Sequence, residues 1–120
     1  MEENASEHRV TRLFPFVLKT RALIVGRDAL RANRGKLHCV IITTDIAEVS
    51  REEVLKDFSH YPVVQYFTSA DLLKYFNVKG AKAVGLLKSG LAQSIYAELK
   101  EFRINQPVIP VKAATPPKPS

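Results

Sequence analysis

Three arginines in the first third of the chain have a spacing that suits phosphate binding. Arg27, Arg31 and Arg34 are separated by four and three residues, which places them on one side of a helix. A guanidinium group binds phosphate through two parallel hydrogen bonds and also stacks on unpaired bases. The predicted helix begins after Gly26, and the free N–H groups of its first turn favour an anion. The pattern favours RNA or phosphate binding, although such a stripe is often only a solvated helix face.

The residue types that most often carry catalysis or bind metals do not form a recognisable site. The single cysteine, Cys39, lies in the most apolar segment, where we expect a protonated and inert thiol. The three histidines lack metal-ligand spacing, and the sequence contains no phosphate-loop, dinucleotide-binding or serine-nucleophile motif. Asp45 follows a buried strand, where catalytic acids often lie, but a carboxylate that closes the loop is the more ordinary role. We therefore predict no enzyme, no cofactor and no metal.

Charge is distributed unevenly along the chain. The net charge is +6; residues 12–36 contain seven bases and one acid, whereas residues 45–57 contain five acids and two bases. This segregation predicts a dipolar surface whose basic face suits a polyanion such as a nucleic acid. Many small domains are nevertheless basic without binding one.

Length and composition are those of one ordinary globular domain. The 120 residues are 46% hydrophobic and 25% charged. No apolar run approaches the roughly 20 residues of a membrane span. The first residues are acidic and do not resemble a signal peptide. We expect a cytoplasmic protein that does not associate with membranes.

Helical and strand patterns alternate between two polar ends. Strands are expected at residues 22–25, 37–42, 63–67 and 83–87, with helices at 9–19, 27–33, from 50 to about 58, from 68 to about 76, and after Gly90. The segment 37–42 is apolar on both faces, which is typical of a strand covered by helices on both sides. The alternation predicts an α/β fold: a three-layer α/β/α sandwich with a four-stranded, mixed but largely parallel sheet.

Two capping boxes are predicted to begin helices. Ser50 is followed three residues later by Glu53, and Thr68 is followed by Asp71. Asn77 is a plausible left-handed residue at the end of the second of these helices.

Three parts of the chain are expected. Residues 1–8 form a flexible leader and residues 9–103 form the domain. Residues 104–120 contain five of the seven prolines with two lysines and no acid, which predicts an extended basic tail.

The order of these segments resembles a known RNA-binding family. A short strand ends at Gly26 and is followed by a basic helix. The second strand is followed by Thr44-Asp45, and the last strand is preceded by a helix that begins Ser69-Ala70-Asp71-Leu72. Over residues 20–103 this pattern is similar to the ribosomal-protein-type kink-turn (pelota-like) RNA-binding superfamily, and in particular to its bacterial YlxQ-like members. In archaeal and eukaryotic members the second helix begins with the motif Gly-x-Asn-Glu. In this sequence Gly26 is present, but Asp28 stands in place of the asparagine and Ala29 in place of the glutamate. The resemblance implies the fold and a basic edge that faces RNA.

The resemblance implies that three loops converge at one end of the sheet: residues 26–28, 43–45 and 77–82. Arg27 and Arg31 would contact phosphate or stack on a base, while Gly26 allows close approach of the backbone. The candidate RNA-binding residues are Gly26, Arg27, Asp28, Arg31, Arg34, Lys36, Thr44, Asp45, Lys79 and Lys82.

The favoured function is a non-catalytic, monomeric RNA-binding protein. Its partner would be ribosomal or other structured RNA, with other RNA-associated proteins as further partners. Two alternatives remain open: a protein–protein adaptor that uses the acidic face at 45–57 or the proline-rich tail, and a regulator that binds a small ligand at Asp45.

Overall fold

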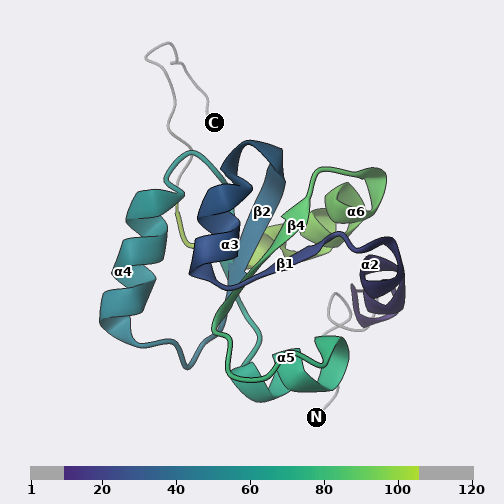
Figure 1. Cartoon of the computed structure of the whole chain (residues 1–120), viewed down its shortest axis with the longest axis horizontal. Helices are drawn as coiled ribbons and strands as arrows, with labels where there is room; N and C mark the ends of the chain where they lie inside the picture. The colour runs from purple at the N-terminus through teal and green to yellow at the C-terminus, as the bar shows by residue number, and fades with distance from the viewer. Residues whose placement is uncertain (1–9, 106–120) are drawn as a thin grey trace.

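Helices and strands alternate along the chain, as the sequence predicts (Figure 1). The computed structural model describes residues 10–105. The helices are α2 (Phe14–Thr20), α3 (Arg27–Ala32), α4 (Glu48–Asp57), α5 (Ser69–Phe76) and α6 (Gly90–Leu99), with short 3₁₀ helices η1 (Arg34–Lys36) and η2 (Lys100–Phe102). The strands are β1 (Leu23–Val25), β2 (Leu37–Ile42), β3 (Val63–Gln65) and β4 (Ala83–Leu87).

The four strands form one mixed sheet in the order β1-β4-β2-β3. Among neighbouring strands only β2 and β3 form a parallel pair, since β4 lies between β1 and β2 and runs antiparallel to both. The predicted mixed sheet is therefore confirmed, but the expectation that it is largely parallel is wrong. The last strand, β4, lies between β1 and β2 and runs in the direction opposite to theirs. The alternation of helices and strands along the sequence does not determine the direction of a strand.

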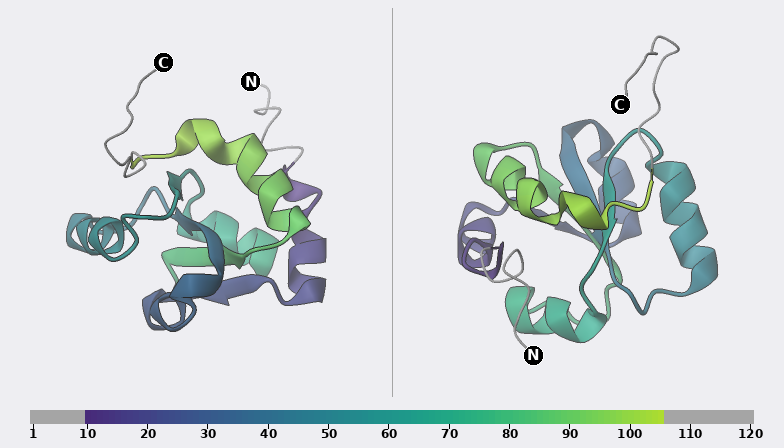
Figure 2. Two further views of the ribbon diagram at one scale, coloured as in Figure 1. Left: turned by 90° about the horizontal axis from the view of Figure 1, so that it is seen from above. Right: turned by 180° about the vertical axis from the view of Figure 1, so that it is seen from behind.

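Helices cover both faces of the sheet, which confirms the three-layer α/β/α sandwich (Figure 2). One cluster of buried residues joins α3 and α4 to one face through Leu30, Val54 and Phe58. The other joins α2, α5 and α6 to the opposite face. Six apolar residues on the expected strands, which such a sandwich would place in its core, are all buried: Cys39, Val40, Ile41, Val64, Val84 and Leu86.

A glycine sits where α3 crosses the sheet. A Cβ atom on Gly85 of β4 would lie 2.5 Å from Cδ2 of Leu30 and 3.0 Å from Cδ2 of Leu37. Both leucines are fully buried and have little room to move. The absent side chain therefore allows α3 to pack closely against β4.

Only one of the two predicted capping boxes exists. The Thr68 hydroxyl accepts a hydrogen bond from the Asp71 N–H, and the Asp71 carboxylate accepts one from the Thr68 N–H. At its other end α5 stops at Asn77, which has the predicted left-handed conformation with φ of 57°. By contrast, α4 begins at Glu48, so Ser50 lies inside the helix and the capping box predicted there is wrong. Two extra residues extend this helix toward the preceding loop.

At the start of the described region, α2 begins at Phe14, one residue before Pro15. Proline is tolerated there because the first N–H groups of a helix have no partner within it. At the other end, Ile104 donates to the Val63 carbonyl, and the Asn105 side chain bonds Val63 and the carbonyl of Tyr61. The first two residues of the expected tail are thus held on β3. The rest of the tail and the expected leader lie outside the described residues.

No helix among residues 10–105 is both long and apolar enough to cross a membrane.

Candidate nucleic-acid interface

The three loops that the sequence analysis singled out meet at one end of the sheet. The Gly26 N–H bonds the Ala83 carbonyl at 3.0 Å, and the Thr43 N–H bonds the Lys82 carbonyl at 2.9 Å. These contacts follow from the sheet register, because β4 begins beside the ends of both β1 and β2. The antiparallel placement of β4 therefore brings the segments 26–28, 43–45 and 77–82 together.

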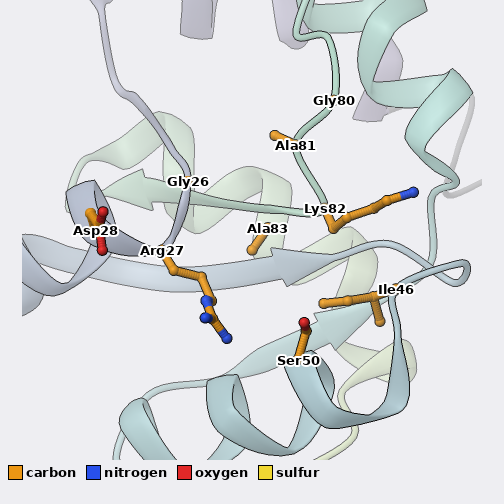
Figure 3. A pocket seen from close by; sticks show the side chains of 9 residues that line it. All are labelled: Gly26, Arg27, Asp28, Ile46, Ser50, Gly80, Ala81, Lys82 and Ala83. Atoms are coloured by element: carbon orange, nitrogen blue, oxygen red, sulfur yellow. The ribbon is translucent and has the colours of Figure 1, made fainter.

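An open pocket of about 380 Å³ lies between two of these loops, 26–28 and 77–82, and the start of α4 (Figure 3). Four of its lining residues were predicted: Gly26, Arg27, Asp28 and Lys82. The others were missed: Ile46, Ser50, Gly80, Ala81 and Ala83. Small and apolar side chains carry no chemical signal in a sequence. Ser50 was assigned to a helix cap, and its place on the first turns of α4 depends on where that helix begins.

Two glycines that line the pocket have positive φ angles. Gly26 has φ of +91° and Gly80 has φ of +82°, both in a region that residues with side chains rarely adopt. A Cβ atom at either position would meet no other atom within 4 Å. The backbone conformation therefore requires glycine here, and the space beside both residues is open to a ligand.

Arg27 and Arg31 are each paired with an acid of α4. The Arg27 guanidinium bonds the Glu53 carboxylate, and Arg31 Nε bonds Asp57 Oδ2 at 2.9 Å. Arg31 also contacts Asp28 at 3.2 Å. The acids are four residues apart, as are the arginines, so two parallel pairs link the helices. Because the side chains are partly exposed, such pairs are weak and water or phosphate can compete for them.

The position of Arg27 connects these ion pairs to the pocket. Its side chain extends from the start of α3 toward α4 and Ser50 (Figure 3). The Arg27 side chain is 33% exposed although it is paired with Glu53. A phosphate in the pocket would therefore contact the Arg27 guanidinium, which its ion pair with Glu53 already holds in one orientation.

Asp45 holds the loop after β2 to the start of α5. Its carboxylate accepts hydrogen bonds from the Ser69 hydroxyl at 2.6 Å and the Ser69 N–H at 3.2 Å. Lys82 Nζ lies 3.5 Å from Oδ2 of the same carboxylate. The hydrogen bond from the Ser69 hydroxyl is the main reason that the pKa of Asp45 is held well below its usual range. The geometry gives Asp45 the loop-closing role, and it directs Lys82 toward α5.

Thr44 and Lys79 lie at the same end of the sheet, and both are exposed. The Thr44 N–H bonds the Phe67 carbonyl at 2.8 Å, and the side chain of Thr44 is at the surface. Lys79 is in the loop between α5 and β4 and directly precedes Gly80, which lines the pocket.

Arg34 and Lys36 are not part of this group. They belong to η1, at the opposite end of the sheet, because α3 carries the chain along the sheet from Gly26 to the start of β2. The Arg34 guanidinium lies over the ring of Phe58, 5.6 Å from its centroid. The ten predicted residues thus divide into two groups at the two ends of the sheet.

The described residues offer no metal-binding cluster of three or more His, Cys, Asp or Glu side chains. Cys39 is buried, and desolvation raises the pKa of its thiol to about 12. At neutral pH this thiol is therefore protonated and unsuited to act as a nucleophile.

Comparison with solved structures shows the fold alone. The chain is similar to a protein of unknown function from Bacillus halodurans, with a TM-score of 0.69 and 16% identity over 76% of this chain and 96% of that one. It is also similar to the Giardia lamblia 15.5kD RNA binding protein, with a TM-score of 0.66 and 16% identity over 85% of this chain and 91% of that one. No family model and no curated protein sequence matches.

Proposed function

We propose that this chain is a non-catalytic RNA-binding protein that contacts ribosomal or other structured RNA at the pocket end of its sheet. The observation that carries the proposal is the pocket itself. Two loops distant in sequence, 26–28 and 77–82, line it together with Ile46 and Ser50; Arg27 extends into it, and two glycines leave its walls open. The similarity in fold to the Giardia lamblia 15.5kD RNA binding protein supports the same function.

The chemistry of the pocket suits an unpaired nucleotide. A volume of about 380 Å³ is within the usual range for small-ligand sites and would receive a base turned out of its stack. Arg27 would bind the phosphate or stack on the base, and Lys79 and Lys82 would add positive charge from the neighbouring loop. Ser50 and the backbone of Gly80 supply polar groups at the walls.

The place of Gly26 agrees with the resemblance to the kink-turn superfamily. This glycine precedes α3 with positive φ, at the point where the family motif begins. The Asn-Glu pair that recognises sheared G·A pairs is replaced by Asp28 and Ala29. Because Ala29 cannot hydrogen-bond a base edge, the proposal names structured RNA and not one RNA motif.

A protein–protein adaptor is the second candidate, and one surface of α4 favours it. Val49 is 70% exposed and lines a second hollow of about 400 Å³ together with Glu48, Glu52, Glu53 and Lys56. An apolar residue among acids suits a basic, partly apolar partner surface.

The test is to remove the arginines and then restore the charge balance. Arg27→Ala with Arg31→Ala should weaken binding of a structured RNA by about 1–3 kcal/mol for each strong contact, with an unchanged circular dichroism spectrum. The exposed pair Lys56→Ala with Lys100→Ala removes the same charge elsewhere and serves as control.

Removing the arginines also leaves Glu53 and Asp57 unpaired, and their charge alone would repel RNA. A second variant therefore adds Glu53→Gln and Asp57→Asn to the arginine changes. If this charge-balanced variant still binds RNA weakly, the arginines contact it. If it binds as the wild type does, the pocket assignment is wrong.

The dependence of binding on salt separates the two candidate functions. RNA binding through several phosphates weakens steeply with salt, with a slope of about −0.7 to −0.9 for each phosphate. A tight, salt-insensitive complex with a protein and no binding of RNA would favour the adaptor.

A further inference from the structure

The loop segments at the end of the sheet opposite the pocket carry an excess of positive charge. Four segments meet there: residues 20–22, 33–36, 58–62 and 88–90. They contain four bases and no acid. The four segments at the pocket end, 26–28, 43–47, 66–68 and 77–82, contain three bases and two acids. The pocket end is thus close to neutral, whereas the opposite end is strongly positive.

Backbone hydrogen bonds fix three of these bases side by side. The Lys88 N–H bonds the Lys36 carbonyl at 2.9 Å, and the Leu87 N–H bonds the carbonyl of Ala22, next to Arg21, at 2.9 Å. Lys88 therefore follows β4 between Lys36, which precedes β2, and Arg21, which precedes β1. Since neighbouring strands are about 4.8 Å apart, the three bases form a row roughly 10 Å wide. We call Arg21, Lys36 and Lys88 the basic edge.

The side chains of the basic edge are exposed and unpaired. All three residues are exposed. Within residues 10–105 none of the three has an ion-pair or side-chain hydrogen-bond partner, in contrast to Arg27 and Arg31. Unpaired cations gain more from a phosphate than cations that must first give up a carboxylate.

A partly exposed row of arginines connects the two ends. α3 begins at the pocket with Arg27, continues through Arg31, and is followed in η1 by Arg34, two residues before Lys36. Figure 1 shows α3 beside β2, with the turn from η1 into β2 and the turn from β4 into α6 together at the upper end of the molecule. The six steps along the backbone from Lys82 to Lys88 correspond to about 20 Å along β4. A single nucleic-acid strand that follows α3 would reach both ends.

We propose that the basic edge is a second RNA contact, which binds the phosphate backbone of the RNA whose unpaired nucleotide occupies the pocket. This inference rests on the proposed RNA-binding function and deepens it. The basic edge would supply affinity without sequence preference, and the pocket would select the structured element. Only an RNA long enough to cover about 20 Å beyond the pocket would gain from both.

The test uses two labelled RNA hairpins with the same asymmetric internal loop, one with a stem too short to reach the basic edge and one with a long stem. The variant Arg21→Gln/Lys36→Gln/Lys88→Gln removes the basic edge. The control Lys19→Gln/Lys56→Gln/Lys100→Gln removes three other exposed charges. Affinity is measured against salt concentration for each protein and each hairpin.

For the long hairpin, the slope of log affinity against log salt should become shallower by about 1 for each base removed, and the control should keep the wild-type slope. The short hairpin should bind the variant and the wild type alike. Equal slopes for the wild type and the basic-edge variant on the long hairpin would overturn the inference and leave the proposed function intact. If the wild type binds neither hairpin, the proposed function fails and the inference fails with it.

Discussion

Nε of Arg31 donates a hydrogen bond to Oδ2 of Asp57 at 2.9 Å and so joins α3 to α4. One turn earlier the Arg27 guanidinium bonds Glu53 in the same way. The basic and acidic segments of the chain, which are separate in sequence, are therefore paired in space. Any phosphate that binds Arg27 or Arg31 must compete with a carboxylate already in place.

This competition gives the first prediction. Glu53→Gln with Asp57→Asn should tighten RNA binding by up to about fivefold for each site, because an exposed ion pair contributes at most about 1 kcal/mol. Fluorescence anisotropy at low salt would measure the gain. Glu48→Gln with Glu52→Gln removes the same charge from α4 without freeing either arginine. If this control tightens binding equally, the effect is one of net charge and the competition does not exist.

The second prediction concerns Asp45 and pH. Its hydrogen bonds with Ser69 lower the pKa of the carboxyl in the folded protein, so the ionised form stabilises the fold above the ordinary aspartate pKa of about 3.9. That contribution is lost as the pH falls below this value toward the folded-state pKa. At pH 7, Asp45→Asn should lower the thermal midpoint by a few degrees. The difference from the wild type should shrink below about pH 4. A difference that stays constant between neutral and strongly acidic pH would contradict this role.

The third prediction separates the real capping box from the apparent one. Thr68→Ala removes the acceptor for the Asp71 N–H and should cost about 0.5–2 kcal/mol of the free energy of unfolding. Ser50→Ala changes a residue inside α4 and should stay within about 0.5 kcal/mol of the wild type. Urea unfolding of both variants provides the comparison. Equal losses for the two would mean that α4 begins at Ser50 after all.

The fourth prediction tests the close contact between α3 and β4. Gly85→Ala places a methyl group against the buried side chains of Leu30 and Leu37, and should destabilise the fold by about 1–3 kcal/mol. Gly90→Ala is the matched control, since a Cβ there meets no atom within 4 Å and Gly90 lies in the first turn of α6. Its effect should be neutral or slightly stabilising. A neutral Gly85→Ala variant would show that the two leucines can move aside.

Much of the fold could be predicted because local signals decide it. The continuous apolar run of β2 indicates burial on both faces, and the box at Thr68 marks the start of α5 at the observed residue. The direction of β4 could not be predicted, because antiparallel and parallel entry bury the same residues. The meeting of the three loops was expected from the family resemblance, and the register of β4 is its physical cause.

The candidate site was predicted only in part, because spacing on one helix does not determine what lies opposite. Arg27, Arg31 and Arg34 do lie on one side of α3 and η1. Helix α4 packs against that side, and its acids pair with Arg27 and Arg31. Because α3 and η1 together extend along the sheet, Arg34 and Lys36 lie at the end opposite the pocket. The dipolar surface expected from the segregated charges is reduced for the same reason, and three bases without an ion pair among residues 10–105 lie together at the basic edge.

The most direct test of the proposed function is ultraviolet crosslinking in cells, followed by sequencing of the bound RNA and mass spectrometry of the crosslinked peptides. The account predicts that structured RNA is recovered and that nucleotides are attached within residues 26–28 or 77–82. The Arg27→Ala/Arg31→Ala variant should recover much less of the same RNA. If the wild type recovers no more RNA than this variant, or if the crosslinks fall only on the acidic face of α4, the chain does not bind RNA in the way proposed.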